Sequence, residues 1–405
     1  MPGVTRLDPR RLYAAPNAIA GLYSRFRVAE RLLLTGHSHQ AWPDAGFEGQ
    51  QRAWLDAAEF VDDKWGRAEE QAAVVRGGWR RLLNDRGGDI ALGQNTHELV
   101  TRMLSALPLR TRPKLLTTTG EFHTVRRQLD RLAEAGLEVE RVPARPVETL
   151  ADRLAVEVTD KVAAVIVSSV LFETAEIVPG LGAVASRCER HGTALLIDAY
   201  HHLNVVPFDI GAMGLESAFV TGGGYKYCQL GEGNAFLRVP PGSVMRPVLT
   251  GWFSEFATRD RRQSGHTVTY GGGTARFAGA TYDPTSHYRA AAVFAFHEQI
   301  GLEADVAREI SLHQVGVLQT LVDALDAPRD LTEIVTTRPE ARGGFLAIRS
   351  SRAEELCAGL RDRGVYCDSR GNVLRLGPAP YLTDEQLRDA VARLGETARA
   401  LAPQS

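Results

Sequence analysis

The sequence predicts an α/β fold with a mostly parallel sheet flanked by helices, plus a smaller α/β unit at its C-terminal end. Short apolar runs alternate with amphipathic segments through the middle of the chain, as strands and helices do in parallel sheets. A length of 405 residues allows two domains around a large buried core. A content of 44% hydrophobic and 24% charged residues is ordinary for a globular protein.

The predicted strands of the sheet are short and apolar. Val162 to Val167 is the clearest, because the run is too short and too β-branched for a buried helix. Further strands are predicted over 90–92, 114–118, 137–142, 194–198, 218–221 and 234–239, with helices over 124–135 and 181–191. After a long helix over 288–301, the last portion is predicted to hold strands over 344–348 and 373–376 and helices over 352–363 and 383–401.

Charge and cysteine content exclude several functions. The net charge is -2 and no basic run is longer than a pair, so we expect neither a nucleic-acid partner nor binding to an anionic membrane. The four cysteines show no C-x-x-C spacing, which argues against a disulfide scaffold and a zinc site, and no metal is expected. The N-terminus lacks an apolar signal core and no long uncharged apolar window follows. We therefore expect a soluble, cytoplasmic protein.

An aspartate and a lysine follow two successive predicted strands. Asp198 ends the run 194–198, and Lys226 comes after Gly222-Gly223-Gly224-Tyr225. A lysine that holds an aldehyde cofactor as a Schiff base must lose its proton, and a carboxylate can keep the cofactor's pyridine nitrogen protonated. Taken alone, each residue is more simply a surface lysine or a turn-forming aspartate. Their order along the chain predicts an enzyme that uses pyridoxal 5'-phosphate (PLP).

The motifs around this pair resemble the kynureninase branch of the fold-type-I, class-V PLP enzymes. They are Asp198-Ala199-Tyr200-His201, Gly224-Tyr225-Lys226-Tyr227 and Gly231-Glu232-Gly233. The resemblance extends, motif by motif, from about Leu33 to Tyr381. It implies a PLP-dependent transferase fold with a seven-stranded sheet, and a homodimer with shared active sites. The expected parts are an N-terminal segment (1–65) that contributes to the small domain and the active-site entrance, a large PLP-binding domain (66–300) and a small C-terminal domain (301–405).

The resemblance also implies roles for individual residues. Lys226 would be the Schiff-base residue, Asp198 would face the pyridine nitrogen with His201 beside it, and Tyr225 would hydrogen-bond the phosphate. The other cofactor-binding residues implied are Asn95 and Thr96 at the phosphate, Phe122 stacked on the ring, Ser169 near the cofactor hydroxyl, Trp252 at the phosphate, and Thr281 reaching the phosphate from the neighbouring subunit. Asn95 is equally suited to cap a helix, and lone Trp and Phe residues are usually part of a core.

The substrate side departs from the family pattern. Arg375, in a segment that resembles the family's Ala-Pro-x-Pro-Leu-Tyr region, would bind the substrate α-carboxylate through its planar guanidinium. Val125 replaces a family carboxylate near the pyridine ring. His37, Ser38 and His39 replace family residues at the substrate end of the pocket.

The function that the resemblance implies is a hydrolase of tryptophan catabolism acting on a small amino acid. It would cleave the Cβ–Cγ bond of L-kynurenine or a related γ-oxo amino acid to alanine and an acyl product such as anthranilate. Tyr225, His37 and His39 are candidates for acid–base catalysis. Transamination, β-elimination, desulfuration and epimerisation stay open as class-V alternatives, although nothing in the sequence marks Cys357 or Cys367 as reactive. A PLP-fold protein without catalysis is the remaining alternative.

Overall fold

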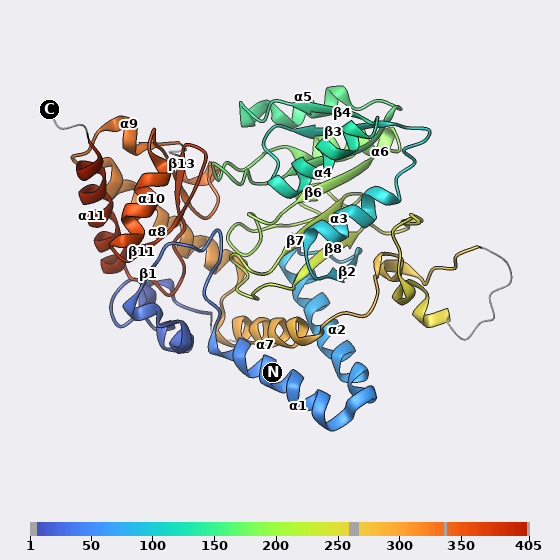
Figure 1. Ribbon diagram of the computed structural model, residues 1–405, viewed down its shortest axis with the longest axis horizontal. Coiled ribbons are helices and arrows are strands. Elements are labelled where there is room, and N and C mark those ends of the chain that lie inside the picture. The colour runs from blue at the N-terminus through green and yellow to red at the C-terminus, as the bar shows by residue number, and fades with distance from the viewer. Residues whose placement is uncertain (1–5, 259–266, 336–337, 403–405) are drawn as a thin grey trace.

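The computed structural model describes residues 6–258, 267–335 and 338–402 (Figure 1). Within these ranges the largest sheet has seven strands in the order β2-β8-β7-β6-β5-β3-β4. Only β8 runs against its neighbours, so the predicted mostly parallel α/β sheet is confirmed. The strands are β2 (Asp89–Gly93), β3 (Lys114–Thr118), β4 (Glu138–Val142), β5 (Val162–Ser168), β6 (Ala194–Asp198), β7 (Phe219–Gly223) and β8 (Ala235–Val239).

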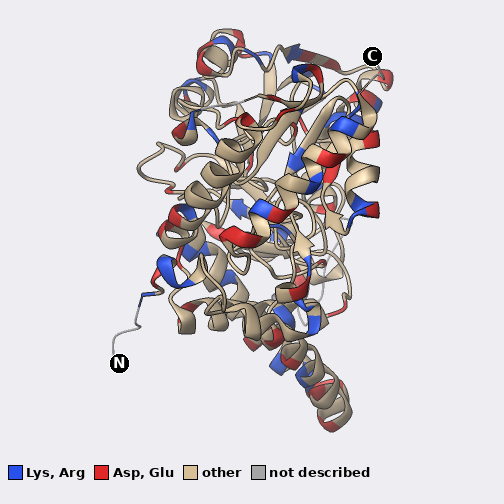
Figure 2. Cartoon of the chain, turned by 90° about the vertical axis from the view of Figure 1, so that its left-hand side faces the viewer, with Lys and Arg blue, Asp and Glu red and all other residues tan. Residues whose placement is uncertain are grey.

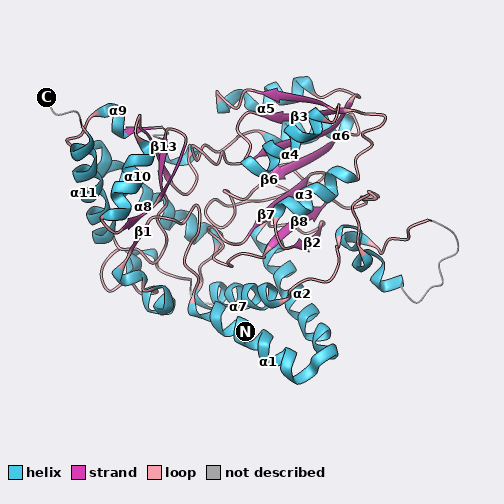
Figure 3. Ribbon diagram, viewed as in Figure 1, coloured by secondary structure: helices cyan, strands magenta, loops and turns pink. Residues whose placement is uncertain are grey.

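Both faces of this sheet are covered by helices, as Figure 3 shows. In β5, Val165 and Val167 belong to one apolar core and Ala164 and Ile166 to the other. This explains why the strand is a continuous apolar run and not an alternating one. The first core includes residues of α2 (Lys64–Leu82), α5 (Leu150–Glu157), α6 (Leu181–Arg190) and α7 (Thr285–Ile300), and the second includes residues of α3 (Thr96–Ser105) and α4 (His123–Glu134).

A smaller α/β unit follows α7 along the chain. Its sheet has four described strands in the antiparallel order β12-β13-β10-β9, which are Asp368–Arg370, Val373–Leu376, Leu346–Arg349 and Glu333–Ile334. Its helices are α8 (Ala304–Asp323), α9 (Arg329–Thr332), α10 (Ala353–Asp362) and α11 (Asp384–Leu401). A capping box of Thr383 and Gln386 begins α11, which fixes its start one residue after the predicted one.

The N-terminal residues pack against this smaller unit. β1 (Leu32–Leu33) pairs in parallel with β11 (Val365–Tyr366). Leu12 and Tyr23 are fully buried in the same apolar core as Leu346 and Leu387. Short 3-10 helices complete the described chain: η1 (Pro9–Leu12), η2 (Ala20–Phe26), η3 (Val28–Glu30), η4 (Val61–Asp63), η5 (Val147–Thr149), η6 (Trp252–Thr258), η7 (Gly273–Phe277) and η8 (Pro339–Ala341).

Helix α1 (Asp44–Phe60) packs mainly on α7, while Ala45 in its first turn packs against the core of the smaller unit. At Gly49 a Cβ atom would lie 2.6 Å from the carbonyl oxygen of Tyr288, so the close approach of the two helices requires a glycine. The N-terminal segment 1–65 thus contacts both parts of the molecule, and the predicted domain boundaries stay a prediction. α1 and α2 extend from the body at the bottom of Figure 1.

Basic and acidic residues lie interspersed along the helices that face the viewer in Figure 2. None of the helices in the described ranges is long and apolar enough to span a membrane.

Candidate active site

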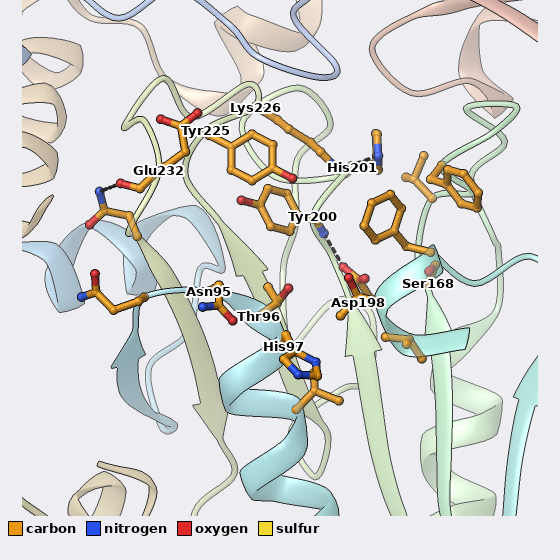
Figure 4. Close-up of a pocket in the computed structure, with 18 of the residues that line it drawn as sticks. Asn95, Thr96, His97, Ser168, Asp198, Tyr200, His201, Tyr225, Lys226 and Glu232 are labelled. Carbon is orange, nitrogen blue, oxygen red and sulfur yellow. Dashed lines mark hydrogen bonds between the residues drawn. The ribbon is translucent and has the colours of Figure 1, made fainter. Parts of the chain in front are cut away.

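A pocket of about 250 Å³ lies at the carboxyl ends of β5 and β6 (Figure 4). The first turns of α3 and α4 and the loop after β7, residues 224–234, also line it. Ligands of parallel α/β sheets bind at this edge. The pocket contains seven of the predicted site residues: Asn95, Thr96, Phe122, Asp198, His201, Tyr225 and Lys226.

Lys226 lies in the loop after β7, where the glycines give its backbone room. A Cβ at Gly223 would lie 2.4 Å from the Tyr200 hydroxyl oxygen, so this position requires glycine. The lysine is buried, and its Nζ is 2.7 Å from Nε2 of His201. Burial lowers the pKa of Lys226 to about 7, although the carboxylate of Asp198 opposes the shift. A large part of the amine is therefore unprotonated at neutral pH, as a nucleophilic lysine requires.

Asp198 is the last residue of β6 and points into the pocket (Figure 4). Its Oδ1 accepts a hydrogen bond from the backbone N–H of Tyr200 at 2.9 Å. Burial raises the pKa of this carboxyl, while the hydrogen bond and the charge of Lys226 lower it. The Lys226 ammonium lies 4.3 Å from the ring centre of Tyr200 and 5.3 Å from that of Phe122. Sequence reasoning did not single out Tyr200, although it lies inside the Asp-x-x-His motif.

The N-terminus of α3 forms another part of the pocket wall, apart from Lys226. Asn95 caps the helix by accepting a hydrogen bond from the Glu98 N–H at 2.9 Å, so the simpler interpretation of Asn95 as a cap is confirmed. Thr96 is the first helical residue, and both side chains line the pocket. The free backbone N–H groups of a helix N-terminus favour an anion there.

Arg375 lies outside this pocket, in β13, and is held by Asp368. Its Nε donates to Asp368 Oδ1 at 2.8 Å and its Nη2 donates to Asp368 Oδ2, while Nη1 donates to the carbonyl oxygen of Phe172 at 2.6 Å. Phe172 lines the pocket, so the guanidinium is hydrogen-bonded to the backbone of a pocket residue. His37 Nε2 also contacts Asp368 Oδ1, at 2.7 Å. We call Arg375, Asp368 and His37 the Asp368 cluster.

Burial and neighbouring charges determine the protonation states of His37 and Asp368 in the Asp368 cluster. Burial, followed by the charge of Arg375, lowers the pKa of His37 to about 4, against the influence of Asp368. The imidazole is therefore neutral at neutral pH and donates its Nε2–H to Asp368. Burial alone would raise the pKa of Asp368, but the hydrogen bonds from His37 and Arg375 hold it well below its usual range. The cluster thus holds one carboxylate between one guanidinium and one neutral imidazole.

His39 and Ser38 differ in how close they come to the pocket. The His39 ring stacks on Tyr225 with ring centres 4.9 Å apart and an angle of 15° between the planes. Its Nδ1 is 3.2 Å from Oε1 of Glu232, and both Tyr225 and Glu232 line the pocket. His39 is largely exposed, so it lies at the pocket entrance. The Ser38 hydroxyl donates to the carbonyl oxygen of Thr35 at 3.2 Å and stabilises the turn there.

Three predicted cofactor residues lie away from the pocket of Lys226. Ser169 is fully buried, with its Oγ donating to the carbonyl oxygen of Asp198 at 3.3 Å; the preceding residue, Ser168, lines the pocket in its place. Side chains alternate along a strand end, which explains why the neighbour faces the pocket. Trp252 and Thr281 line a different cavity, beside α2 and β2.

Glu121 is a buried carboxyl that sequence reasoning missed. Its Oε1 accepts hydrogen bonds from the Thr118 hydroxyl at 2.6 Å and from the Ser168 N–H at 3.2 Å, and its Oε2 accepts one from the Ser168 hydroxyl at 2.6 Å. Burial raises the pKa of Glu121 to about 7; the bonds from Ser168 and Thr118 lower it and the charge of Asp198 raises it further. Ser168 and Asp198 are register partners in β5 and β6.

Comparisons with known proteins agree with this architecture. Among solved structures, a mutant of C-DES with glycine covalently linked to the PLP cofactor matches with a TM-score of 0.80 and 16% identity, over 93% of this chain and 98% of that one. The cysteine desulfurase from Thermococcus onnurineus NA1 matches with a TM-score of 0.75 and 15% identity, over 92% and 96% of the two chains. The fold is therefore that of the fold-type-I, class-V PLP-dependent enzymes.

Sequence matches refine this assignment. Residues 307–394 match the family model of the kynureninase C-terminal domain. A kynureninase of Bacillus anthracis is 27% identical over 94% of this chain and 86% of its own length. An uncharacterized aminotransferase of Bacillus subtilis, YcbU, is 24% identical over 84% of this chain and 87% of its own length. These matches support an assignment to the kynureninase family, which the motifs of the chain also predict.

The pocket fits PLP, the cofactor of this family. It offers a buried amine with a lowered pKa for an aldehyde, a carboxylate for a pyridine nitrogen, and a helix N-terminus for a phosphate. His201 adds a ring nitrogen, Nδ1, that is buried without a hydrogen-bond partner among the described residues. The donor set therefore matches the cofactor at each of its polar ends.

Proposed function

We propose that this protein is a PLP-dependent hydrolase that cleaves the Cβ–Cγ bond of L-kynurenine or a related γ-oxo amino acid. The products would be alanine and an acyl product such as anthranilate, in a step of tryptophan catabolism. The observation that supports this most is the arrangement of one pocket: Lys226 and Asp198 line it together, and Arg375 donates a hydrogen bond to the backbone of Phe172, which also lines it.

Lys226 is the residue that moves the proton of the substrate α-carbon. When bound, the cofactor supplies an electron sink for the electron pair that this proton leaves behind. With a pKa of about 7, the Lys226 amine accepts a proton and returns it without a large energetic cost at neutral pH. His201 Nε2, 2.7 Å from Nζ, orients the amine toward the pocket.

The cofactor-side roles follow from the positions of the side chains. Asp198 would keep the pyridine nitrogen protonated, and Phe122, which lines the same pocket, would stack on the ring and exclude water. Asn95 and Thr96 hold the phosphate at the start of α3. Tyr225, whose side chain also lines the pocket, donates its hydroxyl to the phosphate.

Arg375 binds the α-carboxylate of the substrate. A guanidinium has five N–H groups, and three of those in Arg375 are used by Asp368 and the Phe172 carbonyl. The remaining N–H groups, one on each of Nη1 and Nη2, suit the two oxygens of a carboxylate. Asp368 and His37 fix the orientation of the guanidinium, so His37 acts as a positioning residue and not in direct contact with the substrate.

Tyr225 and His39 are the candidates for the acid–base group at the γ-carbonyl: Tyr225 lines the pocket, and the His39 ring stacks on it. Ser38 holds the turn that places His39.

Trp252 and Thr281 serve the phosphate of a neighbouring subunit in a homodimer. Neither residue lines the pocket of Lys226 in its own chain; both line a neighbouring cavity that shares Gln94 with it, and this supports the proposal. Sedimentation velocity would test it: a dimer is expected, and a monomer with full activity would contradict the shared site.

The decisive experiment combines spectra and product analysis. Purified, PLP-supplemented protein is expected to absorb at the edge of the visible range, and Lys226→Ala to abolish this band. The wild type is then incubated with L-kynurenine and with 3-hydroxykynurenine, and alanine and the aromatic acid are measured. Arg375→Ala is expected to weaken substrate binding by roughly 2 to 5 kcal/mol, because the charge pair is desolvated.

A different class-V reaction is the second candidate. Two findings favour it: the relative YcbU is named an aminotransferase, and the cystine C-S lyase C-DES has a similar fold, with a TM-score of 0.77. The same experiment separates the candidates. An absorbance change on adding the amino acids without release of alanine would refute the hydrolase function and leave the class-V assignment in place.

A further inference from the structure

Two cysteines, Cys357 and Cys367, contact each other next to the Asp368 cluster. Cys357 is in α10, and Cys367 is between β11 and β12. Their Sγ atoms are 3.9 Å apart, and Cys357 Sγ is also 3.6 Å from the carbonyl oxygen of Cys367. A disulfide has an S–S length of about 2.05 Å, so a movement of about 2 Å would close the bond.

The two thiols differ in exposure and protonation. Cys357 is half-buried, whereas Cys367 is buried and donates its S–H to Cys357. This hydrogen bond, helped by the charge of Arg361 on α10, lowers the pKa of Cys357 to about 7 against the effects of burial and of Asp368. The same bond and burial raise the pKa of Cys367. Cys357 is therefore the more exposed and the more readily ionised of the two and reacts first, and the buried Cys367 follows.

The pair is directly connected to the residue that orients Arg375. Cys367 precedes Asp368, the first residue of β12, and Asp368 is the register partner of Arg375 in β13. The Asp368 side chain holds Arg375 at 2.8 Å and His37 at 2.7 Å. A shift of the Cys367 backbone of even a fraction of the required 2 Å would lengthen these hydrogen bonds beyond their normal range.

We propose that Cys357 and Cys367 are an oxidation site for hydroperoxides, that they close to a disulfide, and that closure loosens the Asp368 cluster and weakens binding of a carboxylate at Arg375. The last part rests on the proposed function of Arg375.

The chemistry balances with one hydroperoxide. The Cys357 thiolate attacks a peroxide oxygen and the O–O bond breaks. Cys357 becomes a sulfenic acid, and the other oxygen leaves as hydroxide or alkoxide, which takes a proton from solvent to give water or an alcohol. The Cys367 sulfur then attacks the Cys357 sulfur, the S–O bond breaks, and water leaves with the proton of Cys367. With hydrogen peroxide, two thiols and one peroxide give one disulfide and two waters.

The first experiment tests the disulfide independently of activity. Holoenzyme is treated with hydrogen peroxide, and its mass and peptides are analysed. We expect the loss of two hydrogen atoms, a peptide that links Cys357 to Cys367, and reversal by a thiol reductant. Cys357→Ser should abolish the link, whereas Cys188→Ala, at a buried cysteine in the other unit, should keep it. Oxidation of Cys357 to a sulfinic acid without any link would overturn the proposal.

The second experiment tests the effect on Arg375. The affinity for L-alanine is measured from the change in cofactor absorbance, before and after oxidation. We expect at least a tenfold loss in the wild type, recovery on reduction, and no change in peroxide-treated Cys357→Ser. Unchanged affinity in a fully linked protein would refute the coupling. If Arg375→Ala leaves the affinity of the reduced protein unchanged, the proposed role of Arg375 is at fault and the disulfide is judged by its mass alone.

Discussion

Replacement of Glu121 by glutamine provides a quantitative test of the electrostatics around Asp198. The Glu121 carboxyl is buried behind Ser168 and accepts every hydrogen bond that its two oxygens form in the described structure. Glutamine keeps an acceptor for Thr118 and the Ser168 N–H, and its NH₂ group can donate to the Ser168 hydroxyl. The variant Glu121→Gln therefore imitates the protonated carboxyl, and it differs from the wild type mainly because its side chain cannot ionise.

The size of the effect follows from the pKa of Glu121, which is raised from 4.5 to about 7 in the folded protein. Below pH 4.5 the Glu121 carboxyl is protonated in both the folded and the unfolded protein, so its titration has no effect on stability. Between pH 4.5 and 7 the unfolded chain is ionised while the folded protein keeps its proton, so the free energy of unfolding falls as the pH rises. The total loss is about 3 kcal/mol, taking about 1.4 kcal/mol per pH unit.

The assay is urea denaturation of both proteins, saturated with cofactor, at a series of pH values. The stability of Glu121→Gln relative to the wild type should rise by about 3 kcal/mol between pH 4.5 and 7 and level off above. Glu189→Gln, which removes an exposed carboxyl, serves as the control and should show no such rise. A difference that does not change with pH over this range would refute the reasoning.

Two further predictions concern other buried charges. Asp85→Asn should destabilise the protein by about 3 to 5 kcal/mol in denaturation experiments, because Arg238 would lose its partner at 2.8 Å while staying buried; a loss below 1 kcal/mol would contradict this. Asp198→Asn should lower the pKa of Lys226 below about 7, because the Asp198 charge raises that pKa. The rate at which cofactor-free protein takes up PLP should then reach its plateau at lower pH than in the wild type, and a shift to higher pH would contradict the assignment.

Much of the large sheet could be predicted from the sequence because β5, β7 and β8 are buried along their whole length. In this sheet β3 and β6 begin and end at the predicted residues and β5 extends one residue further; in the smaller sheet β13 begins and ends at the predicted residues. The smaller sheet was predicted only in part. β9 has two residues and β12 is the polar run Asp368–Arg370, so neither carries an apolar pattern, and their strand structure depends on pairing with β10 and β13.

Site residues could be predicted where they stand at the end of a strand and inside a recognisable motif. They could not be predicted where only contacts between distant segments bury them. Asp198 and Lys226 belong to the first kind. Glu121 belongs to the second, since a single glutamate before Phe122 has no sequence signal, and its burial arises from contact with β5. Asp368 had a signal that could have been used: Gly371 and Asn372 form a short turn between β12 and β13, and the antiparallel register then places Asp368 opposite Arg375.

The residues proposed for the cofactor and those proposed for the substrate belong to different parts of the chain. The substrate side can therefore change while the cofactor side is kept. Asp198 lies on a strand of the large sheet and Lys226 in the loop after the next one, where strand ends fix the geometry. The orientation of Arg375 depends instead on Asp368 in the smaller unit and on His37 near the N-terminus. Substitutions in these two segments can therefore move the proposed carboxylate site at Arg375 without disturbing the large sheet. Differences in substrate among relatives should accordingly be sought around His37 and the adjoining His39, and not at the ends of the strands.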